Sequence, residues 1–163
     1  MIPDNVKKIL KKQGYRLVGK KNKEHSAVQV CRWTKKSLRD EGFCYKQQFY
    51  GIESHRCCQM TPSVVFCPNR CVHCWRAIEH TVGNKFPDSA INEISTPEEI
   101  ISGSINAQKK LVEGFKGSSK TNLEKLKEAE EPNQFAISLS GEPTLYPQIG
   151  DLVEELRKQN KES

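Results

Sequence analysis

No apolar run in this sequence of 163 residues reaches the roughly 18 residues that a membrane-spanning helix needs. The first eight residues also lack the apolar stretch of a secretory signal peptide. Internal repeats and low-complexity tracts are absent as well. These absences predict a cytoplasmic protein that binds no membrane, and the length predicts one domain, or one domain with an extension.

Acidic side chains are scarce in the first third of the chain. Residues 1–60 contain 14 Lys and Arg but 5 Asp and Glu, whereas residues 61–163 contain 12 and 15. Such a basic segment favours a polyanionic partner, nucleic acid first, and the alternative is a solvated lysine-rich surface. Aromatic side chains among cations also suit stacking on unpaired RNA bases. The aromatic residues of this segment are Tyr15, Trp33, Phe43, Tyr45, Phe49 and Tyr50.

Cysteine, in contrast, is plentiful, with seven residues in the chain. In the reducing cytosol this number indicates metal ligation rather than disulfides. Cys67, Cys71 and Cys74 follow the spacing C-x3-C-x2-C. Three thiolates on one loop can hold three irons of a [4Fe–4S] cluster and leave the fourth iron open, which indicates an enzyme. Zinc is the alternative, because C-x2-C is also a zinc spacing.

The hydrophobic pattern predicts an α/β fold. We expect helices over residues 3–13, 97–116, 122–130 and 147–159, and strands over 63–66 and 135–140, with 25–60 irregular. The long helix should begin at Thr96, with Pro97 at its first position and Glu99 completing a capping box. A βαβα order predicts a parallel sheet with helices outside it.

Four further cysteines lie upstream, at positions 31, 44, 57 and 58. On spacing alone they could equally be ordinary buried thiols. Together, however, the C-x12-C-x12-C pattern, the stretch His55–Pro62 and the second triad followed by Trp75 and Arg76 resemble the archaeal tRNA 4-demethylwyosine synthases. These are radical S-adenosylmethionine (radical-SAM) enzymes of the wybutosine pathway. The resemblance extends from about residue 31 to the turn at 141–143.

The resemblance implies two [4Fe–4S] clusters, each with an open iron. Cys67, Cys71 and Cys74 would bind the cluster that cleaves S-adenosyl-L-methionine. The second cluster would be bound by Cys31, Cys44 and Cys57. Cys58 would then be a small buried residue without a role in ligation.

The resemblance also implies the reaction, in which carbons of pyruvate are joined to N1-methylguanosine beside the anticodon of tRNA(Phe). Lys46 would form a Schiff base with pyruvate, although by sequence alone it resembles any surface lysine. Contacts to S-adenosyl-L-methionine would come from Trp75 and from the turn after the second strand. That turn consists of Ser140, Gly141, Glu142 and Pro143.

For the fold, the resemblance implies a partial (β/α)6 barrel. Residues 1–60 would form a basic extension with the second cluster, and residues 61–163 the first βα units of the barrel core. Two barrel strands leave an open sheet edge, so we expect this chain to be a truncated part of a longer polypeptide. We also expect a monomer that receives electrons from an external one-electron reductant.

Two other interpretations remain open. One is a zinc-stabilised RNA-binding module, in which His55, His73 or His80 completes the cysteine sites. The other is a radical-SAM enzyme with a different substrate, whose upstream cysteines bind an auxiliary cluster.

Overall fold

The computed structural model describes residues 2–21, 23–74, 76, 78–86 and 93–163. Its centre is a four-stranded mixed sheet in the order β1-β2-β3-β4. The strands are β1 (Arg16–Val18), β2 (Ser26–Gln29), β3 (Cys57–Thr61) and β4 (Gln134–Ile137). The first three strands are antiparallel, while β3 and β4 are parallel. The long connection between β3 and β4 contains α4 (Pro97–Val112), as parallel neighbours require.

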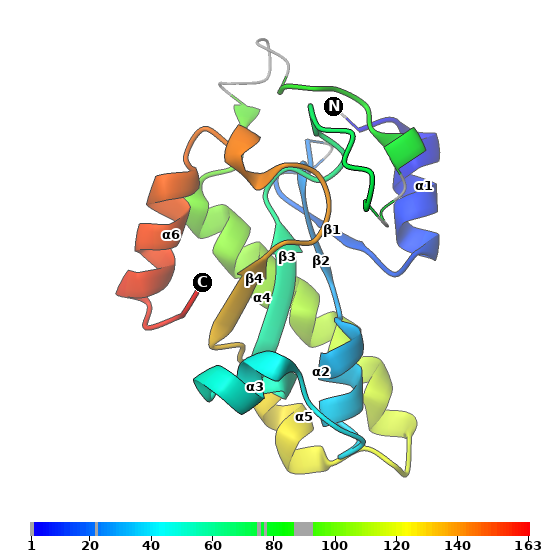
Figure 1. The fold of residues 1–163 in the computed structure, drawn as a ribbon, viewed down its shortest axis with the longest axis vertical. Helices are drawn as coiled ribbons and strands as arrows, with labels where there is room; N and C mark the ends of the chain where they lie inside the picture. Colours follow the sequence, from blue (N-terminus) through cyan, green and yellow to red (C-terminus); the bar gives the residue numbers. More distant parts are fainter. Residues whose placement is uncertain (1, 22, 75, 77, 87–92) are drawn as a thin grey trace.

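Two long helices cover one face of the sheet. Figure 1 shows α4 behind the strands, and α6 (Ile149–Lys158) lies beside it. The N-terminal helix α1 (Asp4–Lys12) packs next to β1. The short helices α2 (Arg32–Ser37), α3 (Tyr45–Tyr50) and α5 (Leu123–Ala129) gather at the lower end of Figure 1.

The hydrophobic core lies between the sheet and these two long helices. Met60 of β3 and Phe135 of β4 are fully buried. They share a cluster with Ile100 and Ile101 of α4 and with Leu152 and Leu156 of α6. Burying each such side chain stabilises the fold by roughly 1.5–3 kcal/mol.

The predicted start of α4 is confirmed. The backbone N–H of Glu99 donates to the Thr96 hydroxyl, and the Thr96 N–H donates to the Glu99 carboxylate at 2.8 Å. Pro97 occupies the first turn, where no donor is needed. The predicted helices at 3–13, 122–130 and 147–159 correspond to α1, α5 and α6, and the predicted strand at 135–140 to β4.

Three predictions about the sheet are wrong. The sheet is mixed rather than parallel, because residues 1–60 contribute β1, β2 and most of β3 to it. Residues 25–60 are therefore not irregular. The strand expected at 63–66 is a buried turn, and the strand of this region lies at Cys57–Thr61 instead. The partial barrel and the division at residue 60 stay predictions.

The described residues contain no helix that is long and apolar enough to span a bilayer.

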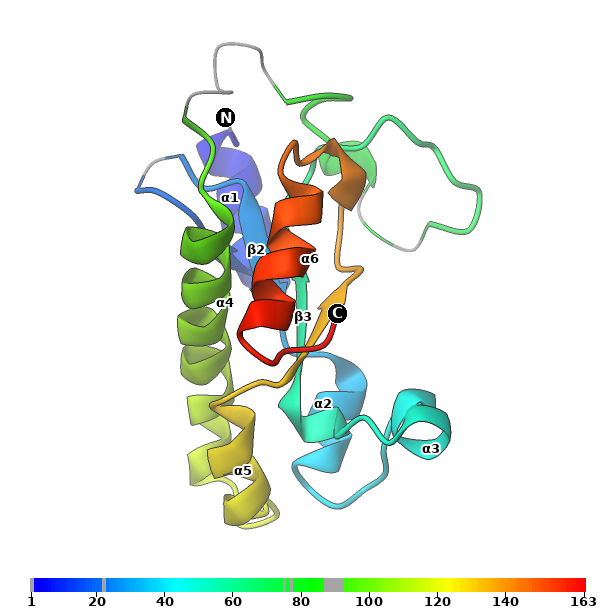
Figure 2. The same ribbon diagram turned by 90° about the vertical axis from the view of Figure 1, so that its left-hand side faces the viewer.

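The two predicted cysteine sites lie at opposite ends of β3. Cys57 is its first residue, and the loop with Cys67 follows its last residue. Figure 2 shows that this loop and α3 both lie on the side of the sheet away from α4.

Candidate iron–sulfur and pyruvate site

The cysteine loop after β3 surrounds a pocket. Cys67 is partly exposed and Cys71 and Cys74 are exposed. All three line a cavity of about 230 Å³ together with Ser140 and Gly141 of the turn after β4. The sequence-predicted ligands and part of the predicted turn therefore meet at one place, where a ligand could contact both. Trp75 lies outside the described residues.

Gly141 brings the turn after β4 into close contact with the residues before Cys67. Its φ is +76°, a conformation that favours glycine. A Cβ at this position would overlap the Ser63 carbonyl oxygen and lie 2.9 Å from the Phe66 oxygen. The close approach of the backbone at Gly141 is thus made to the protein's own backbone.

Glu142 fastens the same contact through its backbone and its side chain. Its N–H donates to the Phe66 oxygen at 2.7 Å, and its carbonyl accepts from the Ser63 hydroxyl at 2.6 Å. Its carboxylate accepts from the Asn69 amide at 3.1 Å and from the Thr144 hydroxyl at 2.8 Å. The turn therefore holds the cysteine loop between Cys67 and Cys71. Pro143 begins the next short helix and lines no part of the pocket described above.

Val65, two residues before Cys67, has a strained backbone with φ +62°. Positive φ is a true outlier for a β-branched residue and costs about 1–3 kcal/mol. Its carbonyl accepts from Val82 N–H at 2.9 Å, and its side chain is buried and lines the pocket. The surrounding contacts thus hold the chain in the bend that leads into the cysteine loop.

The upstream triad is built on regular elements instead of a loop. Cys31 and Cys44 are the residues that precede α2 and α3, and Cys57 begins β3. Burial raises the pKa of the Cys57 thiol to about 11, the Lys46 ammonium acts in the opposite direction, and the thiols of Cys31 and Cys44 add to the rise. These charges act on one another only at short range, so the structure brings the predicted triad and Lys46 together.

Cys58 points to the other face of β3. It is fully buried and belongs to the hydrophobic core, and burial raises the pKa of its thiol. Because successive residues of a strand face opposite sides, Cys57 and Cys58 cannot serve the same site. The prediction that Cys58 is a small buried residue is confirmed.

Lys46 lies on the first turn of α3 and is partly exposed. It lines a cavity with Tyr50 and with two cations near the C-terminus, Arg157 and Lys161. Glu162 lines the same cavity, so the three cations there are accompanied by one carboxylate, and Lys46 also lies within electrostatic reach of Cys57.

Arg76 connects the surroundings of the two triads. Its guanidinium donates to the Tyr15 hydroxyl at 3.0 Å and to the Gln29 side chain at 3.2 Å. Burial lowers the pKa of Arg76, whereas the thiols of Cys74 and Cys31 act in the opposite direction. One cation thus lies within electrostatic reach of a thiol from each triad. The sequence reasoning missed this role, and the only signal was the position of Arg76 two residues after Cys74.

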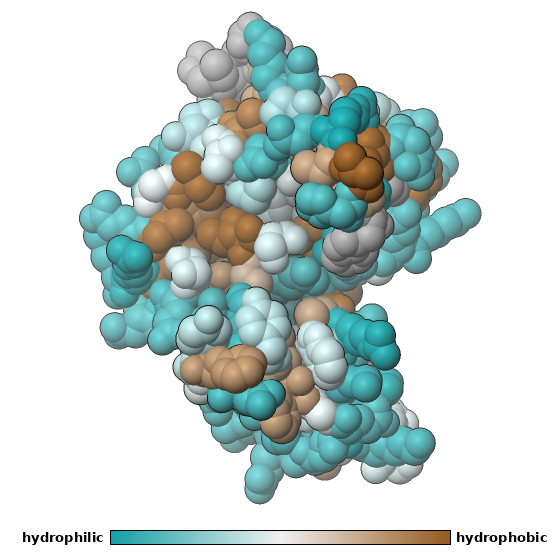
Figure 3. Space-filling view, in the orientation of Figure 1, coloured by the Kyte–Doolittle hydropathy of each residue, from teal (hydrophilic) through white to brown (hydrophobic). Residues whose placement is uncertain are grey.

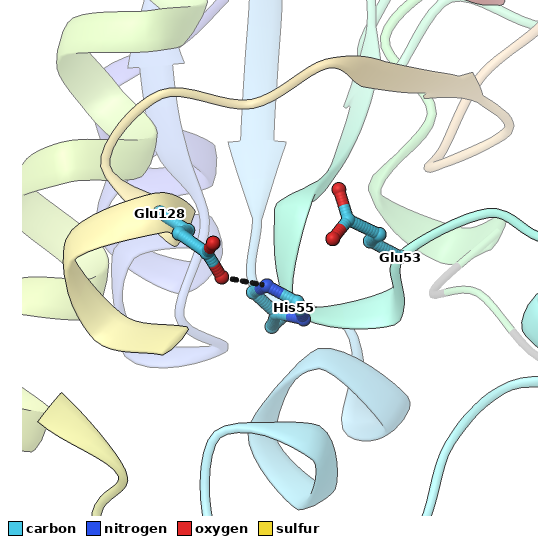
Figure 4. A group of neighbouring side chains, drawn as sticks. All are labelled: Glu53, His55 and Glu128. Carbon is cyan, nitrogen blue, oxygen red and sulfur yellow. Dashed lines mark hydrogen bonds and ion pairs between the residues drawn. The ribbon is translucent and has the colours of Figure 1, made fainter. Parts of the chain in front are cut away.

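The turn before Cys57 contains a buried histidine. Figure 4 shows His55 in the short helix η1 (Ser54–Arg56), with its Nε2 donating to the Glu128 carboxylate of α5 at 2.7 Å. Glu53 lies beside them, and one ligand atom from each of these three residues lies within 4.8 Å of the others. The Glu53 carboxylate accepts from Arg56 and Asn133. His55 is thus hydrogen-bonded directly to Glu128, and Glu53 is bonded to a cation and an amide. We interpret the three residues as a structural group of polar contacts.

This geometry bears on the zinc interpretation. A tetrahedral zinc ion with bonds of about 2.3 Å draws thiolates to within about 4 Å of one another. Among the described residues, the group of three ligands that meets a 4.8 Å limit contains His55 but no cysteine. His73 lines the pocket of Cys67, Cys71 and Cys74 without forming such a compact group, and His80 lies 3.8 Å from Glu79. Among the described residues, the cysteines therefore form no compact tetrahedral zinc site.

The aromatic residues of the basic segment divide into two kinds. Tyr15 is buried, so it offers no surface on which an RNA base could stack. Trp33, Phe43, Tyr45, Phe49 and Tyr50 are between 40% and 72% exposed. They lie on and around α2 and α3, where Figure 3 shows apolar and polar residues mixed at the lower end of the molecule. The Lys36 ammonium lies 5.3 Å from the Trp33 ring centre.

Comparison with known proteins agrees with this geometry. The S-adenosyl-L-methionine-dependent tRNA 4-demethylwyosine synthase of Pyrococcus abyssi is 49% identical over 157 residues, which are 96% of this chain and 44% of that protein. The corresponding synthase of Methanocaldococcus jannaschii is 40% identical over 159 residues, 97% of this chain and 50% of that protein. The chain belongs to the tRNA 4-demethylwyosine synthase family. It spans about half the length of these relatives.

Solved structures of the synthase family have the same fold. The structure of TYW1 with a lysine–pyruvate adduct bound is 40% identical, with a TM-score of 0.82, and the match covers 99% of this chain and 50% of that one. A crystal structure of archaeal TYW1 is 37% identical, with a TM-score of 0.74 and the same coverage. No protein-family model matches the chain.

Proposed function

We propose that this chain forms the part of a radical-SAM tRNA 4-demethylwyosine synthase that holds both [4Fe–4S] clusters and the pyruvate-binding lysine. The observation that carries the proposal is that Lys46, on the first turn of α3, lies within electrostatic reach of Cys57. This lysine lies in a chain that is 40% identical to a TYW1 with a lysine–pyruvate adduct. The cysteine loop after β3 and helix α3 also lie on the same side of the sheet (Figure 2).

The pocket of Cys67, Cys71 and Cys74 fits a cluster with an open corner. Its thiols are accessible, and Ser140 and Gly141 close the pocket opposite them. A cluster bound here would supply one electron for the cleavage of S-adenosyl-L-methionine. The chain's own contribution is to orient that cofactor between the thiols and the backbone of the turn. Trp75 and the side chain of Glu142 stay candidate contacts.

The thiols of Cys31, Cys44 and Cys57 would hold the second cluster, with Lys46 within electrostatic reach of Cys57. The high pKa of Cys57 means that its thiol is protonated when free, so metal binding must release a proton. The Lys46 amine lies next to this site and condenses with the keto carbon of pyruvate, which forms a C=N bond and releases water. Pyruvate bound in this way would have its carbonyl carbon near the thiols of the second cysteine site.

The RNA substrate would approach the face that carries both sites. A base in an anticodon loop is unpaired and costs little to splay out. The exposed aromatic residues around α2 and α3 offer stacking surfaces of about 1–3 kcal/mol per base, and nearby lysines can contact phosphates. We propose that tRNA(Phe) with N1-methylguanosine binds along this face.

The remaining parts of the proposal concern the whole enzyme. We propose that β3 and β4 begin a partial (β/α)6 barrel, that residues 1–60 form the extension with the second cluster, and that the enzyme is monomeric. Electrons would come from an external one-electron reductant. A radical-SAM enzyme with another substrate would share the cysteine sites but would not form an adduct on Lys46.

The experiment is to trap pyruvate on the anaerobically reconstituted protein. Borohydride reduces the C=N bond to a stable amine, and peptide mass spectrometry locates labelled pyruvate. We expect label on Lys46, its loss in Lys46→Arg, and full label in the matched control Lys35→Arg. Label that is absent, or equal in the two variants, would contradict the proposed function.

A further inference from the structure

The helix that carries Lys46 is not anchored by buried side chains of its own. None of the residues of α3 (Tyr45–Tyr50) is buried. Two of its aromatic side chains, Phe49 and Tyr50, are 69% and 72% exposed. Hydrophobic burial, which fixes most helices in proteins, therefore does not fix this one. Its position must depend on polar contacts.

Those contacts converge on Ser54, which is only 2% exposed. The N–H of Cys44, the residue before α3, donates to the Ser54 hydroxyl at 2.9 Å. The Ser54 N–H in turn donates to the side-chain oxygen of Gln47 on α3 at 3.1 Å. These two hydrogen bonds resemble those of a capping box, except that Ser54 lies ten residues after Cys44 and not three.

Ser54 also contacts α2, the helix that follows Cys31. The hydroxyl of Thr34, on α2 just after Cys31, donates to the Ser54 carbonyl at 3.0 Å. The same hydroxyl lies 3.4 Å from the Cys57 carbonyl. One buried serine is therefore hydrogen-bonded to the segments that carry Cys31 and Cys44, and it lies three residues before Cys57.

The turn around Ser54 is itself fixed to the body of the protein. His55 is bonded to Glu128 of α5, and Glu53 is bonded to Asn133, as Figure 4 illustrates for the histidine. A residue on such a fixed turn can transmit its position to a helix that has no buried side chains.

We propose that Ser54 is the positioning residue of the second cysteine site, which holds α3, and with it Cys44 and Lys46, against the turn that carries Cys57. This inference rests on the proposed function, because it assigns Ser54 to the site at which pyruvate is bound. Ser54 itself touches neither the cluster nor pyruvate in this role. It sets the distance between the lysine amine and the metal site.

The test compares Ser54→Ala with Ser104→Ala in the reconstituted protein. Ser104 is a second fully buried serine, on α4, whose hydroxyl has no hydrogen-bond partner among the described residues. The substitutions remove the same atom from buried sites. The readouts are the rate of borohydride-trapped pyruvate on Lys46, the pyruvate concentration for half-maximal trapping, the iron content and the midpoint of unfolding.

We expect Ser54→Ala to trap pyruvate about five- to tenfold more slowly than Ser104→Ala, because the N–H of Cys44 loses its acceptor and the start of α3 loses one of its two hydrogen bonds to Ser54. The fall in the trapping rate should exceed any fall in iron content. A role in folding alone would shift the unfolding midpoint and leave the rate per folded, iron-loaded protein unchanged. Equal trapping rates at equal iron content would overturn the inference.

A second variant keeps the test decisive if Ser54→Ala does not fold. Gln47→Leu removes only the acceptor of the Ser54 N–H from a partly exposed side chain, and we expect trapping to slow about two- to threefold. An unchanged rate would count against Ser54. Absence of trapping in the parent protein would overturn both the proposed function and this inference, whereas unchanged variants would overturn the inference alone.

Discussion

The two cysteine sites are held in place by opposite means. The loop of Cys67, Cys71 and Cys74 has little regular structure, and close backbone contacts from the turn at Gly141 and Glu142 hold the residues that lead into it. The triad of Cys31, Cys44 and Cys57 is placed by two helix starts and a strand, which side-chain hydrogen bonds join. The first site should therefore be sensitive to backbone changes, and the second to single side chains.

The largest expected effect comes from Gly141→Ala. The new methyl group would overlap the Ser63 carbonyl, and the backbone would be strained at φ +76°. We expect the free energy of unfolding to fall by more than about 3 kcal/mol, with loss of iron from the first site. Chemical denaturation and an iron assay measure both effects.

Gly150→Ala is the matched control, because Gly150 lies in α6 with nothing within 4 Å of a new Cβ. We expect it to be neutral or to stabilise the protein by up to about 1 kcal/mol. Similar unfolding curves for the two variants would refute the view that the turn after β4 clamps the cysteine loop.

Cys57→Ala and Cys58→Ala separate the faces of β3. Cys57→Ala should remove the iron of one cluster, about four atoms per chain. Cys58→Ala should keep all iron and lower the free energy of unfolding by about 1–2 kcal/mol, because Cys58 is packed in the core. Anaerobic iron and sulfide analysis measures both variants. Loss of iron from Cys58→Ala and not from Cys57→Ala would contradict the assignment of Cys57 as the ligand.

His25, which contacts Pro62 and Ser95, should make the free energy of unfolding depend on pH. Its Nε2 accepts from the Ser95 N–H at 3.0 Å, so its Nδ1–H donates to the Pro62 carbonyl at 2.7 Å, and the ring is neutral. Burial lowers the pKa of His25 below 6.5. The unfolded chain then binds the proton more readily, so the stability contribution is complete above about pH 6.5 and declines as the pH falls below it.

The measurement is the free energy of unfolding of the parent and of His25→Gln at several pH values from about 7.5 to about 5. We expect the parent to lose more stability than the variant over this range. Parallel curves would mean that His25 does not titrate differently in the folded and unfolded states.

The smallest expected effect comes from Asn69→Ala. It removes one exposed hydrogen bond between the cysteine loop and the Glu142 carboxylate, while the bonds from the Glu142 backbone remain. We expect a change of less than about 0.5 kcal/mol in the free energy of unfolding and no loss of iron. A marked loss of iron would show that side chains, and not the backbone, hold this loop.

The sequence predicted those features that depend on neighbouring residues. The capping box of Thr96 and Glu99 and the stripes of α1 and α6 are local, and they were located within a few residues. The apolar run at 63–66 is buried but is not the predicted strand, because Val65 adopts a positive φ that its residue type disfavours. Strands of three or four residues, such as β1 and β2, carry too short a pattern to be recognised.

In the candidate site, too, local features could be predicted from the sequence and long-range contacts could not. The cysteine motifs and Lys46 could be named from spacing and family resemblance. The partners of these residues could not, because Ser63 and Glu142, or His55 and Glu128, are separated by more than seventy residues. Such pairs are created by the crossover between β3 and β4.

The most direct test of two separate cluster sites is an anaerobic count of iron, sulfide and zinc on two triple variants. One carries Ala at Cys31, Cys44 and Cys57, and the other at Cys67, Cys71 and Cys74. We predict about eight irons per chain for the parent and about four for each variant, with matching sulfide. Stoichiometric zinc, or loss of all iron from either variant, would contradict the account.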